Sequence, residues 1–133
     1  MILSKILLVE DDVDIQKVVR MSLKLRGIKD VVVAENGEEC LALMRQIKPD
    51  VILLDVMMPK MDGFETCRRL KANPETRSVP VIFLTAKAQQ FEIKRGLEEG
   101  ALGYLTKPFD PMTLYDQIIA LLNKKTDPGK KET

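Results

Sequence analysis

The sequence predicts an α/β fold, a doubly wound parallel sheet with helices on both faces. Five short runs rich in β-branched residues and leucine alternate along the chain with segments of helical periodicity. Three of the runs contain four consecutive large apolar residues (6–9, 51–54 and 81–84), which is typical of strands covered on both faces. Because strand and helix alternate five times, we expect right-handed crossovers and a single layered domain.

The five predicted strands are residues 5–9, 30–34, 51–54, 81–84 and 103–105. The second and the last strands have shorter runs of large apolar residues and a more mixed composition, so we expect them at the edges of the sheet. Apolar residues at helical spacing predict five helices, which contain residues 15–23, 40–47, 64–70, 91–97 and 114–122. Glycine or proline marks their ends: the helices stop at Gly27, before Pro49, before Pro74 and at Gly100, and Pro111 is expected in the first turn of the fifth.

Length and composition exclude several classes of protein. The chain has 133 residues and a net charge of +1, which suits one globular domain and argues against a broad nucleic-acid-binding or membrane-binding surface. No apolar run approaches the ~18 residues of a membrane span, and the first residues lack the features of a signal peptide. We therefore expect a cytoplasmic protein. Residues 1–124 are expected to form the domain, and residues 125–133 a flexible tail or a truncated linker.

The sequence contains no histidine, which excludes histidine-ligated zinc, Ser-His-Asp or Cys-His catalysis and an intrinsic phosphohistidine. Cys40 and Cys67 are too few for a four-thiolate metal site, and both lie at apolar positions of predicted helices. We expect them to be small buried core residues. The chemistry of this chain must therefore use carboxylates, hydroxyls and lysines.

Polar and charged residues follow four of the predicted strands. Ligands of an open α/β sheet bind beyond the carboxyl ends of its strands, so these residues are expected at one edge. They are Glu10, Asp11 and Asp12 after the first strand, Asp55 after the third, Thr85 after the fourth and Lys107 after the fifth. Singly, Asp12 and Thr85 could equally be helix caps. Together, the carboxylates predict a site for a hard divalent cation such as Mg²⁺, with Lys107 and Thr85 placed to bind a tetrahedral oxyanion. The predicted chemistry is phosphoryl transfer to an aspartate.

Five motifs carry a resemblance to a known family. They are Leu8-Val9-Glu10-Asp11-Asp12, Leu54-Asp55-Val56-Met57-Met58-Pro59, Met61-Asp62-Gly63, Thr85-Ala86 and Lys107-Pro108-Phe109. In this order and spacing they resemble the receiver domain of two-component response regulators, over roughly residues 4–124. The resemblance implies a flavodoxin-like (βα)5 fold with a five-stranded parallel sheet in the order 2-1-3-4-5.

The resemblance also implies roles for individual residues. Asp55 would accept a phosphoryl group from the phosphohistidine of a sensor histidine kinase or phosphotransfer protein. Asp11 would bind Mg²⁺ directly and Glu10 through water, together with Asp55 and the Met57 carbonyl oxygen. Lys107 would pair with Asp55, and Lys107-Pro108 would be a cis peptide. Thr85 would turn inward to the phosphoryl group, and Tyr104 would follow into the space that it leaves.

Such a domain is a phosphorelay receiver that catalyses its own phosphorylation and dephosphorylation, and it is not a conventional enzyme. Phosphorylation would change the face formed by the fourth helix, the fifth strand and the fifth helix, where an effector protein binds. Family members that dimerise for transcription often carry paired acids before the Tyr104-like aromatic residue and an arginine in the last helix. Here the segment reads Gly100-Ala101-Leu102-Gly103-Tyr104, and residues 112–124 contain no arginine. We expect a monomer without direct nucleic-acid or membrane binding, with a phosphorylation-dependent dimer as the alternative.

Three other functions are the alternatives to this one. An aspartyl-phosphate phosphatase needs a second acid two residues after the nucleophile, and that position is Met57. A flavin-binding module needs a hydroxyl-rich or glycine-rich phosphate loop after the first strand, where this chain has three acids. A receiver-like interaction domain that no longer accepts phosphate is the third. Met57 and Lys87 occupy positions that vary in the family and tune hydrolysis of the acyl phosphate.

Overall fold

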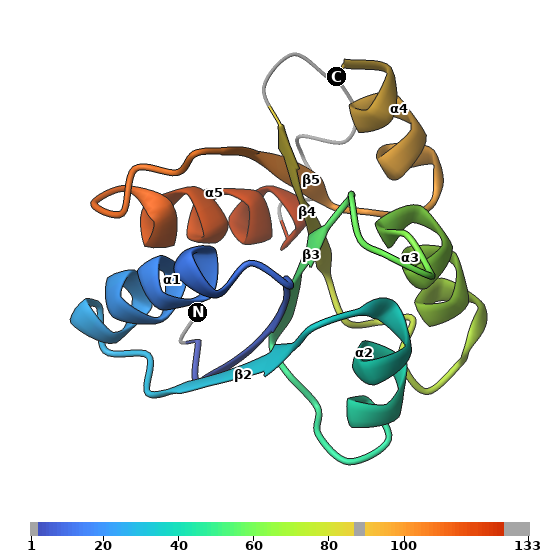
Figure 1. Cartoon of the computed structure of the whole chain (residues 1–133), viewed down its shortest axis with the longest axis horizontal. Coiled ribbons are helices and arrows are strands. Elements are labelled where there is room, and N and C mark those ends of the chain that lie inside the picture. The colour runs from blue at the N-terminus through green and yellow to red at the C-terminus, as the bar shows by residue number, and fades with distance from the viewer. Residues whose placement is uncertain (1–2, 87–89, 127–133) are drawn as a thin grey trace.

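Five parallel strands form one sheet in the order β2-β1-β3-β4-β5 (Figure 1). The computed structural model describes residues 3–86 and 90–126. The strands are β1 (Lys5–Val9), β2 (Asp30–Ala34), β3 (Val51–Asp55), β4 (Val81–Ala86) and β5 (Gly103–Lys107). The strand order and the edge positions of β2 and β5 confirm the predicted topology.

Five helices cover the two faces of the sheet. They are α1 (Val13–Leu25), α2 (Gly37–Leu43), α3 (Gly63–Ala72), α4 (Gln90–Glu98) and α5 (Leu114–Thr126). Helices α1 and α5 lie on one face, and α2, α3 and α4 on the other (Figure 1). Among the described residues, no helix is both long enough and apolar enough to cross a membrane.

The three central strands, β1, β3 and β4, are apolar on both faces because each face of the sheet has its own core. Alternate strand residues such as Ile6, Leu8 and Leu53 pack with α1 and α5. Their neighbours, such as Leu7 and Leu54, pack with α2 and α3. This two-sided burial explains why the strands appear in the sequence as continuous apolar runs and not as alternating ones. Cys40 and Cys67 lie in the second core, fully buried as expected.

The register of the sheet places the polar strand ends beside one another. Asp55 on β3 pairs with Leu84 on β4, and the next residue, Thr85, pairs with Thr106 on β5. Lys107 follows, paired with Ala86. The backbone ladder itself therefore brings Asp55, Thr85 and Lys107 to the same edge.

The element boundaries differ from the predicted ones at several ends. Strands β3, β4 and β5 continue by one or two residues, so that Asp55, Thr85 and Lys107 belong to strands and do not follow them. Helix α2 ends at Leu43, and a tighter turn follows it, in which the amides of Arg45 and Gln46 bond three residues back to Ala42 O (3.2 Å) and Leu43 O (2.9 Å). Helix α5 begins at Leu114, after a turn that contains Pro111, and extends two residues beyond position 124. Positions 127–133 of the expected tail lie outside the described residues.

Candidate functional site

Glu10 leaves the end of β1 with its side chain turned into the protein. Its amide donates to Ala34 O on β2 (2.9 Å), which continues the strand pairing by one residue. The carboxylate is 1% exposed, and its Oε2 accepts a hydrogen bond from the Asp12 amide (3.1 Å). The Gln16 side-chain amide donates to Glu10 O (2.7 Å), so α1 holds this segment from the other side.

Asp11 and Asp12 have different positions although they are adjacent. Asp11 is exposed at the mouth of the site. Asp12 is the N-cap of α1, and its Oδ1 accepts from the amides of Asp14 (2.9 Å) and Ile15 (3.3 Å). The capping role that the sequence left open for Asp12 is thus the observed one. The fourth helix does not use Thr85 as a cap, because Thr85 lies within β4.

Asp55 ends β3 and is 4% exposed. Its Oδ1 accepts a hydrogen bond from the Met57 amide (3.2 Å), which orients the carboxylate at the start of the following loop. The loop returns so closely that a Cβ at Gly63 would lie 2.3 Å from Asp55 O. Gly63 therefore has a packing role, since any side chain there would displace the backbone of Asp55.

Lys107 joins the two buried carboxylates. Its Nζ lies 2.7 Å from Glu10 Oε1 and 3.1 Å from Asp55 Oδ1. With Asp11 nearby, three carboxylates share one ammonium group, which leaves an excess of two negative charges when all are ionised. A divalent cation would neutralise that excess.

Burial and charge change the pKa values of these groups. Burial raises the pKa of the Glu10 carboxyl and outweighs the hydrogen bond with Lys107. Burial also raises the pKa of Asp55, against the opposing charge of Lys107. For Lys107, burial acts to lower the pKa, but the two carboxylates outweigh it and the pKa is raised. Desolvated carboxylates of this kind stay ionised more readily when a metal ion is bound beside them.

The acidic groups fit a hard cation. Ligand oxygens of Glu10, Asp11 and Asp55 all lie within 4.8 Å of one another. The donor set consists of oxygen atoms, which suits Mg²⁺ or Mn²⁺ better than zinc. The Met57 backbone, two residues further along the chain, lies beside Asp55, because its amide donates to the Asp55 carboxylate.

Thr85 and Tyr104 lie on adjacent strands near this cluster. Thr85 is 3% exposed, and its hydroxyl donates a long hydrogen bond to Ala86 O (3.4 Å). Tyr104 is 41% exposed on β5. In this structure the tyrosine side chain is thus at the surface. Lys87 lies outside the described residues.

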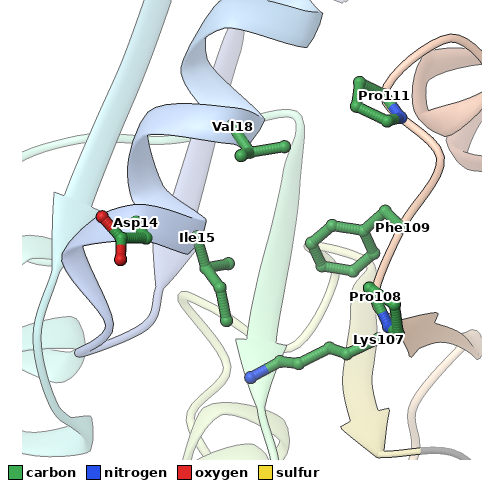
Figure 2. A pocket seen from close by; sticks show the side chains of 7 residues that line it. All are labelled: Asp14, Ile15, Val18, Lys107, Pro108, Phe109 and Pro111. Carbon is green, nitrogen blue, oxygen red and sulfur yellow. The ribbon is translucent and has the colours of Figure 1, made fainter.

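A pocket of about 470 Å³ adjoins the acidic cluster (Figure 2). One wall is the start of α1, with Ile15 and Val18, and the other is the segment after β5, with Phe109 and Pro111. Lys107 lines the pocket and also contacts Asp55, so the pocket and the acidic cluster are adjacent. The Lys107-Pro108 peptide is cis, as expected.

Two features of this site were not predicted from the sequence. Lys107 was expected to pair with Asp55 alone, whereas it also pairs with Glu10, because Glu10 is turned inward. No role in the site was expected for Gln16, whereas its side chain holds the Glu10 carbonyl. The position of Gln16 one helical turn after the Asp12 cap is the signal that could have indicated it.

Comparisons of sequence and of structure with known proteins point to the same family. The family model of the response regulator receiver domain matches residues 6–119. The DNA-binding dual master transcriptional regulator RpaA of Synechocystis is 42% identical over 123 residues, which is 92% of this chain and 50% of that protein. The chain spans about half the length of the curated relatives it matches.

Two solved structures show the same fold. The chemotaxis response regulator CheY4 of Vibrio cholerae has a TM-score of 0.83 and 32% identity, covering 90% of this chain and 99% of that one. A Mn²⁺-bound form of response regulator Rcp1 has a TM-score of 0.73 and 28% identity, covering 92% of each chain.

Proposed function

The chain belongs to the response regulator receiver domain family, and we propose that Asp55 is the residue through which it performs phosphoacceptor signalling. The observation that carries this assignment is the pairing of a buried Asp55 with Lys107, beside two further carboxylates. Asp55 Oδ1 is held by the Met57 amide, which fixes the carboxylate as an oriented nucleophile. A phosphohistidine on a sensor histidine kinase or phosphotransfer protein is the proposed donor, because this chain has no histidine of its own.

Mg²⁺ is the proposed cofactor. Receiver domains bind Mg²⁺ at an acidic cluster, and Glu10, Asp11, Asp55 and the Met57 carbonyl are the groups that would hold it here. The bound cation would neutralise the charge that develops on the transferred phosphoryl oxygens. Lys107 would bind one of those oxygens, and the Thr85 hydroxyl would donate to another.

The pocket beside Lys107 supports an approach of the donor protein from this side. A donor that brings a phosphohistidine to Asp55 must place its own surface against the neighbouring surface of this domain. Ile15, Val18 and Phe109 offer apolar contact area there (Figure 2). We therefore assign this pocket to contact with the donor.

The proposed output surface is the face formed by α4, β5 and α5. Leu97 and Tyr104 are exposed large apolar residues on this face, which suits binding of an effector protein. The matched regulator RpaA is a DNA-binding protein, but the segment before Tyr104 lacks the paired acids of dimerising family members. We propose a monomeric cytoplasmic domain that signals by contact with another protein.

An intact-mass measurement tests the acceptor assignment. After incubation with Mg²⁺ and acetyl phosphate, we expect one phosphate adduct, lost in Asp55→Asn and on removal of Mg²⁺ with EDTA. Asp30→Asn is the matched control, because Asp30 is an exposed acid that pairs with Lys5 away from the site, and it should keep the adduct. If neither acetyl phosphate nor a phosphorylated kinase gives an adduct, the chain is an interaction module that no longer accepts phosphate.

A further inference from the structure

A second cavity, of about 830 Å³, lies between the outer face of α1 and the start of β2. Four of the side chains that line it are cationic: Lys17, Arg20, Lys24 and Lys29. Ile28 and Val31, both nearly buried, provide its apolar part. Lys24 is in the last turn of α1, whereas the acidic cluster adjoins the other end of this 13-residue helix, so the two sites are separate.

Most of this positive charge is unpaired. Among the ion pairs of residues 3–86 and 90–126, none includes Lys17, Lys24 or Lys29. Arg20 donates one of its five N–H groups to Val31 O (2.8 Å). The net charge of the whole chain is only +1, so a concentration of four cations around one cavity is a local feature.

The C-terminal end of a helix favours nearby cations, and this effect accounts for Lys24. It does not account for Lys17 or Arg20, because the effect falls off beyond the last turn. It also does not explain why Lys29, from the far side of the turn, lines the same cavity. Cations from two walls therefore line one cavity, which is an arrangement that suits an anionic ligand.

The backbone of the turn is not available to that ligand. The amides of Arg26, Gly27 and Ile28 donate to Leu23 O or Lys24 O at 3.0–3.1 Å, which closes the end of α1. An anion in the cavity would therefore be held by ammonium and guanidinium groups alone. Such binding depends on charge and weakens strongly with salt.

We propose that this cavity binds a compact anion carrying several phosphate groups, at a site distinct from Asp55. A compact polyanion can contact Lys29 and the cations of α1 at once, whereas an extended acidic peptide would follow only the line of Lys17, Arg20 and Lys24 along the helix. The strong negative charge of an oligophosphate matches four cations. Lysine binds phosphate as a point charge and needs no planar partner.

Titration with tripolyphosphate tests the proposal, in low salt and without Mg²⁺, followed by amide shifts in NMR spectra and by calorimetry. We expect saturable one-to-one binding, with the largest shifts between residues 17 and 31. The variant Lys17→Ala/Lys24→Ala/Lys29→Ala should bind about tenfold or more weakly, since three surface charge contacts are lost. Arg45→Ala/Lys48→Ala/Lys94→Ala is the matched control, because it removes three exposed cations elsewhere, and its affinity should stay within about twofold.

Titrations with other anions show which chemical group the cavity recognises. ATP should bind at the same residues, and an affinity equal to that of tripolyphosphate assigns the site to the phosphate chain, whereas a higher one adds the nucleoside. Tighter binding of hexaglutamate or duplex DNA at these residues would overturn the proposal. So would shifts centred on Lys107, an equal loss in the control variant, or no saturable shift up to about 10 mM tripolyphosphate. The alanine variants retain helix-favouring residues in α1, and their amide spectra report that the fold is kept.

Discussion

The ammonium group of Lys107 lies closer to the carboxylate of Glu10, at 2.7 Å, than to that of Asp55, at 3.1 Å. The positive charge of Lys107 thus partly neutralises the same carboxylates that a bound divalent cation would neutralise. The same side chain both compensates the metal-free site and repels a metal ion that enters it.

Lys107→Ala is therefore expected to bind Mg²⁺ more tightly than the unchanged protein. Removing one positive charge a few ångströms from the cation should strengthen binding by at least about fivefold, even with strong solvent screening. Amide shifts in a Mg²⁺ titration measure the affinity, and Lys48→Ala serves as a control at an exposed site. An affinity equal to or below that of the unchanged protein would contradict the charge argument.

Asp55→Asn is expected to stabilise the metal-free protein. Burial raises the pKa values of Asp55 and Glu10, so the folded state holds protons that the unfolded state has already released. Stability therefore falls as pH rises through this range, and the penalty is complete above the raised pKa values. At pH 7 the asparagine variant should therefore be more stable than the unchanged protein in EDTA, with a weaker dependence on pH.

Urea unfolding at several pH values measures this difference. Glu75→Gln is the control, because Glu75 is exposed and should change stability by less than about 0.5 kcal/mol. Saturating Mg²⁺ should reduce the difference between the unchanged protein and Asp55→Asn. A variant that is less stable than the unchanged protein in EDTA would show that the Asp55 charge is already compensated.

The two cysteines should be unreactive in the folded protein. Burial raises the pKa of Cys40 to about 12, with a smaller effect from Cys67, and raises that of Cys67 to about 11. Both thiols therefore stay protonated and shielded at pH 8, and a thiol reagent should modify them only after unfolding in guanidinium. Rapid modification of either thiol under native conditions would contradict this burial.

The same shifts predict a loss of stability in alkali. Above an ordinary thiol pKa of 9.0 the unfolded chain releases protons that the folded chain keeps, so stability should fall with rising pH. Each thiol adds a slope that approaches about 1.4 kcal/mol per pH unit. Cys40→Ala should reduce that slope, and an unchanged slope would exclude a contribution from Cys40.

Met57→Asn is expected to shorten the lifetime of the acyl phosphate. The Met57 side chain is 69% exposed, beside the carboxylate that its own amide binds. A bulky apolar side chain at this point would hinder attack by water, whereas asparagine can hydrogen-bond it. Loss of the adduct mass with time measures the lifetime, Met58→Asn is the control in the same loop, and equal lifetimes for Met57→Asn and the unchanged protein would exclude the shielding role.

Much of the fold and of the site could be predicted because the relevant signals are local. Four consecutive apolar residues indicate a strand buried on both faces, and Gly27 and Gly100, with φ values of 91° and 103°, end helices as expected. The polar residues at strand ends could be placed at one edge because parallel strands share a direction. The burial of Glu10 could not be predicted, since it depends on how α1 and β2 enclose the segment. Leu97 was expected within an apolar stripe but is 47% exposed, because a stripe does not show how far a helix covers its end of the sheet.

The register that aligns Asp55, Thr85 and Lys107 has a consequence for how this chain tolerates length changes. One residue inserted or deleted within β4 or β5 would turn Thr85 or Lys107 to the opposite face of the sheet. In β4, where buried residues lie on both faces, the apolar residues would still find a core, so the domain could persist while the acceptor constellation was destroyed. Length variation among sequences of this type should therefore be confined to the helices and connecting loops and be absent from these strands.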